Sequence, residues 1–472
     1  MGRRALCGVV AVAALLATAC GGGDDDNDRG SSASGPSDEL PECPVDALDD
    51  ATQPVELTYW HGMTRVAEDT LKQLTDDFNA SQDKVEVKLV NNSAGDQQQK
   101  FIAGLKTGDL PDVIQHDSTL LQQMVDTGTV VPIESCIEAY RDQGGKFDTN
   151  DFVPQMLSYY QLDGVQWDLP FGVATPVLVY NKAAFRKAGL DPAEPPTTLD
   201  DYRDAAQALK DAGYKYGAAV AIEAWHFEEL YAKAGGVYVD HHNGRDGRAA
   251  KVMFDDATGK DIYELFGQMN EDGLVVTNPR EGPDSINNLL AIGNGDAGMT
   301  IVSSSALGSV LEVLGSGQYK GVELGVGPLP GDSEDGGAVV AGGGLAITAR
   351  DPAKQAAGWE FVKYLTSTKA QATWAAATGY APVRTSTIAE PQLADAWSKT
   401  PGLRVSYDQL VDGAENDATA GPMVGDMQTV RKAVEDALTA MFVDGLDPDE
   451  ALARAAKDAN EAIASYNDRV GG

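Results

Sequence analysis

Histidines are the side chains best suited to acid–base or metal chemistry near neutral pH, but their spacing here supports neither. The five histidines are His61, His116, His226, His241 and His242. The last two follow Asp240 in a polar stretch, VDHHNGRDG, and adjacent ligands on such a loop are a weak basis for a zinc site. We therefore expect no metal site.

Motifs that carry nucleotide or hydrolytic chemistry are also missing. No GxxxxGK[ST], HExxH or GxSxG occurs, and the three glycines at 342–344 lack the spacing of a dinucleotide-binding turn. Carboxylate pairs such as Asp255–Asp256 are so frequent in this chain that pairing cannot indicate a glycosidase. These absences favour binding over catalysis, and we expect no enzymatic activity and no cofactor.

Binding residues can be argued from their types. Sugar-like ligands favour aromatic faces and donor-rich side chains, whereas phosphate favours Arg or a helix N-terminus. Arg431 lies in an expected helix with few other positive charges. The sequence leaves open whether it binds an anion or is a solvated Arg paired with Glu435 one turn later. The aromatic candidates are Tyr59, Trp60, Tyr159, Tyr160, Trp225, Trp374 and Tyr380.

The charge balance restricts the partners. The 472 residues include 36 Lys and Arg against 72 Asp and Glu, which gives a formal net charge of −36. Nucleic acid and anionic membrane surfaces would repel such a chain, so we expect no nucleic-acid partner. A single well-placed Arg can still select a small anion against this background. Because 43% of the residues are apolar, sizeable cores are expected.

The first 20 residues resemble a bacterial lipoprotein signal peptide. Arg3 and Arg4 precede a short apolar stretch, and small residues lead to Cys20, which would be lipidated. The alternative is an ordinary secretory signal cleaved nearby. Residues 20–53 are an acidic, low-complexity tether that cannot bury a core. We expect residues 1–19 to be removed and the chain to be anchored by lipid alone.

Cysteine usage agrees with an extracytoplasmic setting. Cys7 would leave with the signal and Cys20 would carry lipid, so Cys43 and Cys136 remain as an even pair. In an oxidising compartment they are expected to form a disulfide, and the alternative is two free buried thiols. The bond would join the end of the tether to the first domain.

The body alternates strand and helix patterns. Strands are expected at 55–60, 85–90 and 110–115 with helices between them, which predicts a parallel or mixed sheet with helical crossovers. Residues 166–181 contain Pro170 and Pro176 in an extended apolar run, which indicates a crossing between domains plus an edge strand. Residues 325–330 and 339–348 are expected to be paired strands returning to the first domain, followed by helices.

We thus expect an α/β chain of two lobes, each a mixed sheet flanked by helices, with a cleft between them. Residues 54–171 and 300–348 are assigned to the first lobe, and residues 172–299 and 349–472 to the second.

Several motifs together resemble a known family. They are YWHGM at 59–63, DDFNAS at 76–81, KTGDLPDVIQ at 106–115, FVPQMLSYY at 152–160, the run PFGVATPVLVYNKAAFRKAGLDPAEPPTT at 170–198, NGDAGMTIVSSS at 294–305, TGYAPV at 378–383 and MVGDMQTVR at 423–431. The chain is similar to extracellular solute-binding proteins of carbohydrate ABC importers, in particular the group that binds glycerol-3-phosphate and glycerophosphodiesters. This resemblance implies the two-lobed fold of periplasmic binding proteins, closing over a ligand.

The resemblance also implies site residues. Ser303, Gly343, Tyr380 and Arg431 occupy phosphate- or glycerol-contacting positions, and Trp225 matches an aromatic residue over the ligand. The family's Glu falls on Ser118, with Asp117 beside it as a substitute. A contacting Ser is replaced by Ala174, and a contacting Tyr is missing near residues 94–96. The phosphate end thus matches the family, whereas the glycerol or head-group end differs.

The function that the resemblance implies is capture of glycerol-3-phosphate or a glycerophosphodiester, such as glycerophosphocholine, and delivery to the permease subunits of an ABC importer. The alternative ligand is an oligosaccharide. A secreted phosphodiesterase or glycosidase is the alternative from another class, but it would need a metal cluster or a placed carboxylate pair. We expect a monomer, lipid-anchored on the extracytoplasmic face of the cell membrane.

Overall fold

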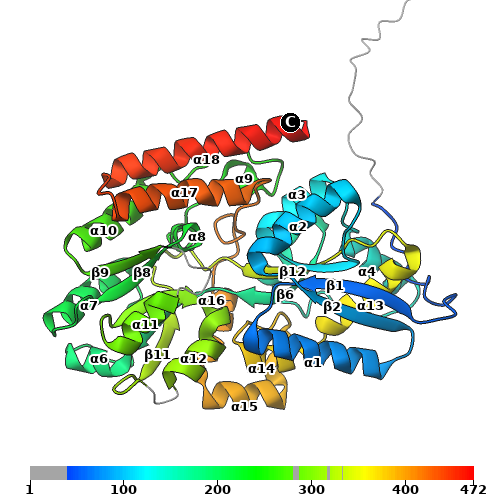
Figure 1. Cartoon of the computed structure of the whole chain (residues 1–472), viewed down its shortest axis with the longest axis horizontal. Coiled ribbons are helices and arrows are strands. Elements are labelled where there is room, and N and C mark those ends of the chain that lie inside the picture. The colour runs from blue at the N-terminus through cyan, green and yellow to red at the C-terminus, as the bar shows by residue number, and fades with distance from the viewer. Residues whose placement is uncertain (1–39, 280–285, 316–318, 332, 472) are drawn as a thin grey trace, which may run out of the picture. The chain divides into compact units, whose positions relative to one another are not determined.

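A computed structural model describes residues 40–279, 286–315, 319–331 and 333–471, and the chain forms one unit from Pro41 onward (Figure 1). Two five-stranded sheets organise it. The first has the order β2-β1-β3-β12-β6 and the second has the order β11-β7-β10-β8-β9. A hairpin of β4 (Gln161–Leu162) and β5 (Val165–Gln166) stands apart. Cys20 and the expected signal lie outside the described residues.

The first sheet arises from the alternating pattern expected from the sequence. Its strands are β1 (Val55–His61), β2 (Val85–Asn91), β3 (Val113–Asp117), β6 (Leu169–Ala174) and β12 (Ala341–Ile347). β1 pairs in parallel with β2 and β3, and such parallel neighbours need helical crossover connections. β12 then runs antiparallel between β3 and β6. We call this sheet and the helices packed on it the first lobe.

The helices of the first lobe cover both faces of its sheet. They are α1 (Arg65–Ser81), α2 (Ala94–Thr107), α3 (Leu121–Asp126), α4 (Ile133–Asp142), α5 (Pro154–Ser158), α13 (Pro352–Leu365), α14 (Thr368–Thr378) and α15 (Pro391–Lys399), with 3-10 turns η1 (Ser118–Leu120), η3 (Thr385–Ala389) and η4 (Pro401–Arg404). α13 packs closely because Gly358 lets its backbone approach Val113 and Ile347. Ile114, on the opposite face of β3, packs with Phe101 of α2.

The second lobe is built in the same way. Its strands are β7 (Pro176–Asn181), β8 (Ala218–Ile222), β9 (Val275–Pro279), β10 (Met299–Ser303) and β11 (Leu324–Pro328). Its helices are α6 (Lys182–Lys187), α7 (Leu199–Asp211), α8 (Ala224–Lys233), α9 (Asp240–Gly244), α10 (Ala257–Glu271), α11 (Ile286–Asn294), α12 (Leu307–Gly315), α16 (Val405–Val411), α17 (Met427–Phe442) and α18 (Pro448–Val470), with the 3-10 turn η2 (Ser304–Ala306). α17 and α18 lie side by side (Figure 1). Thr198 caps α7 through a capping box, as its sequence context indicates.

The chain passes between the two sheets where the sequence predicts. β6 is the last strand of the first sheet and β7 belongs to the second, with Thr175 between them. Pro170 is therefore accommodated in an edge strand, as expected. In contrast, β11 and β12 lie in different sheets, so the prediction that residues 325–348 form paired strands is wrong. That segment is a second crossing.

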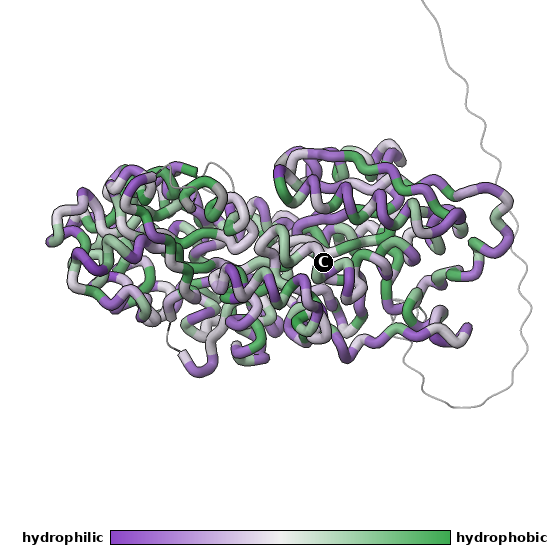
Figure 2. Tube along the Cα trace, turned by 90° about the horizontal axis from the view of Figure 1, so that it is seen from below, coloured by the Kyte–Doolittle hydropathy of each residue, from purple (hydrophilic) through white to green (hydrophobic). Residues whose placement is uncertain are grey.

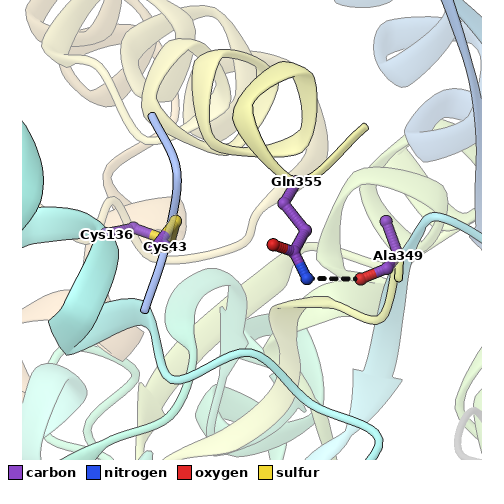
Figure 3. Close-up of a disulfide and its surroundings, with 4 residues drawn as sticks. All are labelled: Cys43, Cys136, Ala349 and Gln355. Atoms are coloured by element: carbon purple, nitrogen blue, oxygen red, sulfur yellow. Dashed lines mark hydrogen bonds between the residues drawn. A yellow bond between two sulfur atoms is a disulfide. The ribbon is translucent and has the colours of Figure 1, made fainter. Parts of the chain in front are cut away.

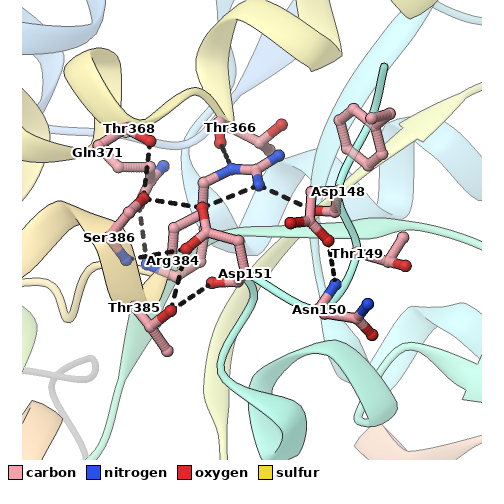
Figure 4. A network of polar contacts seen from close by, with 12 residues as sticks. Asp148, Thr149, Asn150, Asp151, Thr366, Thr368, Gln371, Arg384, Thr385 and Ser386 are labelled. Carbon is pink, nitrogen blue, oxygen red and sulfur yellow. Dashed lines mark hydrogen bonds and ion pairs between the residues drawn. The ribbon is translucent and has the colours of Figure 1, made fainter. Parts of the chain in front are cut away.

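Part of the lobe assignment also needs correction. Residues 300–348 were placed in the first lobe, but β10 and β11 lie in the second sheet. Residues 349–472 were placed in the second lobe, but α13 and α14 pack with β1 and α1. The stretch that follows α14 is also tied to the first lobe (Figure 4). There, Arg384 donates to the carbonyls of Asp148 and Thr366 and pairs with Asp151. Helical periodicity alone could not reveal which sheet a helix covers.

The hydropathy pattern follows this construction, since apolar stretches run through the interior of the trace and hydrophilic ones along its outer segments (Figure 2). Cys43 and Cys136 are joined by a disulfide, so residue 43 is attached to α4 (Figure 3). Beside them, the Gln355 side chain donates to the carbonyl of Ala349. Within the described ranges, no helix is both long and apolar enough to cross a membrane.

Candidate functional site

Arg431 lies in the first half of α17. Asp426 caps this helix by accepting hydrogen bonds from the N–H and hydroxyl of Thr429. The Arg431 guanidinium donates from Nε to Glu228 Oε1 at 2.9 Å and from Nη2 to Glu228 Oε2 at 2.7 Å. Glu228 belongs to α8, and its side chain is 4% exposed. Arg431 is therefore held in a two-pronged ion pair with 17% of its side chain exposed, and it is not a solvated helix-face residue.

Asp117 approaches the same guanidinium from the first lobe. It ends β3, and its Oδ1 lies 4.0 Å from Arg431 Nη1, beyond hydrogen-bond distance. Burial lowers the pKa of Arg431, but the charges of Glu228 and Asp117 outweigh this effect and raise it above its ordinary value. Arg431 thus remains charged at a point where the two lobes meet, with Nη1 the least engaged of its nitrogens.

Ser118 follows Asp117 at the start of η1. Its hydroxyl lies 2.9 Å from the Tyr159 hydroxyl, and both side chains are buried. Burial raises the pKa of Tyr159 to about 12, so this phenol stays protonated and can donate. Asp117 itself accepts a hydrogen bond from the N–H of Thr119, which fixes the start of the turn.

Gly343 and Tyr380 lie on the other side of Asp117. Gly343 is paired with Asp117 on one neighbouring strand and with Gly172 on the other. A Cβ placed on Gly172 would come within 3.5 Å of the Tyr380 ring. Tyr380 stacks on Trp374 with ring centroids 5.3 Å apart, and its hydroxyl points to the sulfur of Met63 at 3.8 Å. The absence of side chains at the two glycines leaves room on the sheet for the Gln115 side chain, next to the Tyr380 ring.

Ser303 and Trp225 come from the second lobe. Ser303 ends β10, where its hydroxyl lies 2.7 Å from that of Ser305. The next residue, Ser304, donates its N–H to the carbonyl of Thr175 at the crossing. Trp225 stands at the start of α8, one turn before Glu228, and is 8% exposed. Helical spacing thus puts the aromatic ring and the carboxylate on one face of α8.

Five of the seven predicted ligand residues lie in one connected region, and Ser303 and Trp225 are joined to it only through their neighbours in the chain. Arg431 meets Asp117, which pairs with Gly343, and Tyr380 adjoins Gly172 on the next strand. Gly379, which precedes Tyr380, lies against the Ser304 carbonyl, and this connects Ser303. Asp117 and Gly343 come from the first sheet, whereas Ser303, Trp225 and Arg431 come from the second lobe. That these residues bind ligand stays a prediction.

Comparison with known proteins places the chain in a family. Residues 73–404 match the model of bacterial extracellular solute-binding proteins. The chain belongs to this family. As a solute-binding protein, it is 28% identical over 423 residues to the sn-glycerol-3-phosphate-binding periplasmic protein UgpB of Pectobacterium atrosepticum, covering 87% of this chain and 92% of that protein. Its similarity to UgpB of Salmonella typhimurium is also 28%, over 87% and 93% of the two chains.

Solved structures of solute-binding proteins have the same fold. The GacH receptor of Streptomyces glaucescens, solved unliganded and with acarbose, matches with a TM-score of 0.72 at 21% identity, over 88% of this chain and 99% of that one. UgpB of Mycobacterium tuberculosis, solved with glycerophosphocholine, matches with a TM-score of 0.70 at 20% identity, over 88% and 99%. The chain therefore has the two-lobed fold of these solute-binding proteins.

Two features of this solute-binding protein were not anticipated from the sequence. Glu228 was missed, although its position one turn after Trp225 could have signalled it. Gln115 was also missed, because a buried strand position gives no sign that a polar side chain is unpaired. As for metal, the described part of the chain has no group of three or more His, Cys, Asp or Glu residues placed to hold an ion.

Proposed function

We propose that this protein captures glycerol-3-phosphate or a glycerophosphodiester between its lobes and delivers it to an ABC permease. The observation that carries the proposal is Arg431, a partly exposed guanidinium of the second lobe that is held by a buried carboxylate and whose Nη1 is directed at the first lobe. Similarity to UgpB proteins over most of the chain supports the same ligand class.

Arg431 would bind the phosphate through Nη1, since Nε and Nη2 are held by Glu228. The Ser303 and Tyr380 hydroxyls would add neutral donors, together with backbone at Gly343. Trp225 would lie over the apolar or cationic part of the ligand. Binding would draw the lobes together because the contributing residues come from both of them.

The charges around Arg431 favour a diester over a monoester. One guanidinium faces two carboxylates, those of Glu228 and Asp117. A phosphomonoester brings about two negative charges at neutral pH, whereas a diester brings one, so the diester meets less repulsion. Asp117 would attract the cationic group of a ligand such as glycerophosphocholine, because its carboxylate is 57% exposed.

An oligosaccharide is the second candidate ligand. Glu228 already neutralises most of the Arg431 charge, and a guanidinium–carboxylate pair can bind sugar hydroxyls as well as phosphate. The Tyr380–Trp374 stack offers an aromatic surface of the kind that sugar rings favour. On this alternative, neutral sugars bind and phosphate esters do not.

Isothermal titration calorimetry with glycerol-3-phosphate, glycerophosphocholine and a panel of disaccharides separates these ligands. We expect the strongest binding for glycerophosphocholine. Absence of heat with every phosphate ester would refute the proposed ligand class, and heat with a disaccharide would then support the alternative. Product formed during long incubation with a bound ligand would instead reveal an enzyme.

Lipid anchoring at Cys20, a monomeric state and exposure on the outer face of the membrane are also part of the proposal. Expression with a radiolabelled fatty acid tests the anchor. We expect label in the wild-type chain and none in Cys20→Ala, which should be released from the membrane. Equal labelling of both chains would contradict lipidation at this residue.

A further inference from the structure

Gln115 is a buried amide in the first sheet. It lies on β3, two residues before Asp117, and is 3% exposed. Neither Nε2 nor Oε1 of its side chain has a hydrogen-bond partner among the described protein atoms, whereas its main-chain carbonyl accepts from the Gln97 side chain. Buried polar groups are nearly always hydrogen-bonded, because leaving one unpaired costs free energy.

The surroundings of this amide are shaped by two glycines. A Cβ on Gly343 would come within 2.6 Å of Gln115 Nε2, and one on Gly172 would come within 3.0 Å of the same atom. Any side chain at either position would therefore displace the amide. Beyond Gly172 stands the Tyr380 ring, 3.5 Å from where that Cβ would be. The amide thus lies flat on the sheet between two of the predicted ligand residues.

The position along β3 also fits a ligand site. Alternate residues on a strand face the same side, and two residues span about 7 Å, so Gln115 lies one step along the strand from Asp117. Ligands of α/β proteins bind beyond the carboxyl ends of the parallel strands, where β1 and β3 end here. A molecule with phosphate at Arg431 could reach Gln115 with its other end.

We propose that the Gln115 side chain binds hydroxyl groups of the ligand. An amide offers N–H donors and a carbonyl acceptor side by side, which suits a vicinal diol, because each hydroxyl both donates and accepts. In a glycerophosphodiester this diol is the free end of the glycerol, so the assignment deepens the proposed function and rests on it. Gln115 selects ligands that carry the diol and leaves those without it weakly bound.

The test is a cycle of two proteins and two ligands. Wild type and Gln115→Met are titrated with glycerophosphocholine and with its analogue lacking the 2-hydroxyl. We expect the wild type to bind the diol at least roughly tenfold more tightly than the analogue, and Gln115→Met to bind both equally. Equal discrimination by the two proteins would overturn the assignment. If Gln115→Met does not fold, Gln115→Asn is used in its place, because its shorter side chain moves the amide away from the ligand. The same two affinities are then compared.

Thermal unfolding without ligand gives an independent reading. Met removes an unpaired buried amide, so Gln115→Met should melt at the same temperature as the wild type or above it. The control is Gln371→Met, because the Gln371 amide is also buried but donates to the Leu365 carbonyl and accepts from Val383 N–H. The control should melt lower and discriminate like wild type. A similar drop for Gln115→Met would show a structural role and overturn the proposal.

If wild type binds no glycerophosphate at all, the proposed function fails separately. The same cycle is then run with the disaccharide that binds best in the panel and its deoxy analogues. If Gln115→Met no longer distinguishes the disaccharide from a deoxy analogue, the hydroxyl-binding role of Gln115 is still supported. If it distinguishes every analogue as well as wild type does, that role is refuted.

Discussion

Arg431 and Arg245 both connect segments that are far apart in the sequence, but their guanidinium groups have opposite kinds of partners. Arg431 pairs with the Glu228 carboxylate, and its Nη1 makes no hydrogen bond to Asp117. Arg245 uses all three nitrogens on main-chain carbonyls. Its acceptors are Ser158, Tyr159, Gln161, Ala420 and Gly421.

The two environments change the pKa in opposite directions. Burial lowers the pKa of Arg245 to about 10, because carbonyl dipoles replace water without a full opposing charge. At Arg431, the carboxylates raise it despite burial. Arg245 follows Gly244, which is preceded by three non-glycine residues with positive φ, His241, His242 and Asn243, so its bonds also hold a strained turn. We infer that Arg245 is structural and that Arg431 keeps capacity for a ligand.

The largest effect is expected from Arg431→Met. It leaves the buried Glu228 carboxylate unpaired, which should lower the free energy of unfolding by about 4 kcal/mol and weaken phosphate-ester binding roughly 100-fold or more. Chemical denaturation and calorimetry measure these quantities. The matched control Arg431→Met/Glu228→Gln should recover most of the stability and none of the affinity. Recovery of binding in the double variant would show that Arg431 does not contact the ligand.

Arg245→Met should lower the free energy of unfolding by about 3 kcal/mol, because it leaves five carbonyls without this donor. Arg245→Lys should recover part of the loss, since an ammonium can reach only some of these oxygens. Affinity should change far less than in Arg431→Met. An equally large loss of affinity would mean that Arg245 stabilises the ligand-bound arrangement of the lobes rather than the fold. The proposed difference between Arg245 and Arg431 would then be wrong.

Lowering the pH should destabilise the region around α8, which holds Glu228, more than the region around Arg245. His226 lies in α8, two residues before Glu228, and burial lowers its pKa to about 4. Because the unfolded chain then binds the proton more readily than the folded one, stability is present above about pH 6.5 and is lost as pH falls. From pH 7 to pH 5 the loss should be about 2 kcal/mol.

Hydrogen exchange at the two pH values locates this effect. After correction for the slower intrinsic exchange in acid, the amides of α8 should have lower protection factors at pH 5 than at pH 7, while the protection factors of residues 158–161 beside Arg245 should change little. His226→Phe should remove most of the pH dependence, whereas His241→Gln, on an exposed turn, should retain it. A pH dependence that persists in His226→Phe would assign the acid response to other groups.

The sequence predicted the features that depend on local pattern. Strand–helix alternation indicated the first sheet, the two prolines near 170 and 176 marked the crossing, and motif matches pointed to Arg431. It could not indicate which sheet β10, β11 and α13 would join, because such pairing is decided by tertiary contacts. Nor could it indicate that Glu228 neutralises Arg431, since the two lie 203 positions apart.

The smallest expected effect concerns a third arginine, Arg248, which joins the lobes with a partly exposed ion pair. It donates to both oxygens of Asp126 at 2.6 and 2.8 Å, and the Tyr466 hydroxyl donates to the same carboxylate at 2.6 Å. Asp126 ends α3 of the first lobe, whereas Tyr466 belongs to α18 of the second. These bonds can form only when the lobes are together, so they favour the arrangement that encloses a ligand.

Asp126→Asn should therefore weaken ligand binding by about 1 kcal/mol, or roughly fivefold, because Arg248 is 31% exposed and solvent screens the pair. Small-angle scattering should show a larger radius of gyration for the ligand-free variant. Lys432→Gln, which removes an exposed pair within α17, serves as control and should change neither quantity. Unaltered affinity in Asp126→Asn with lower stability would show that Arg248, like Arg245, supports the fold and leaves Arg431 as the ligand-linked member of the three.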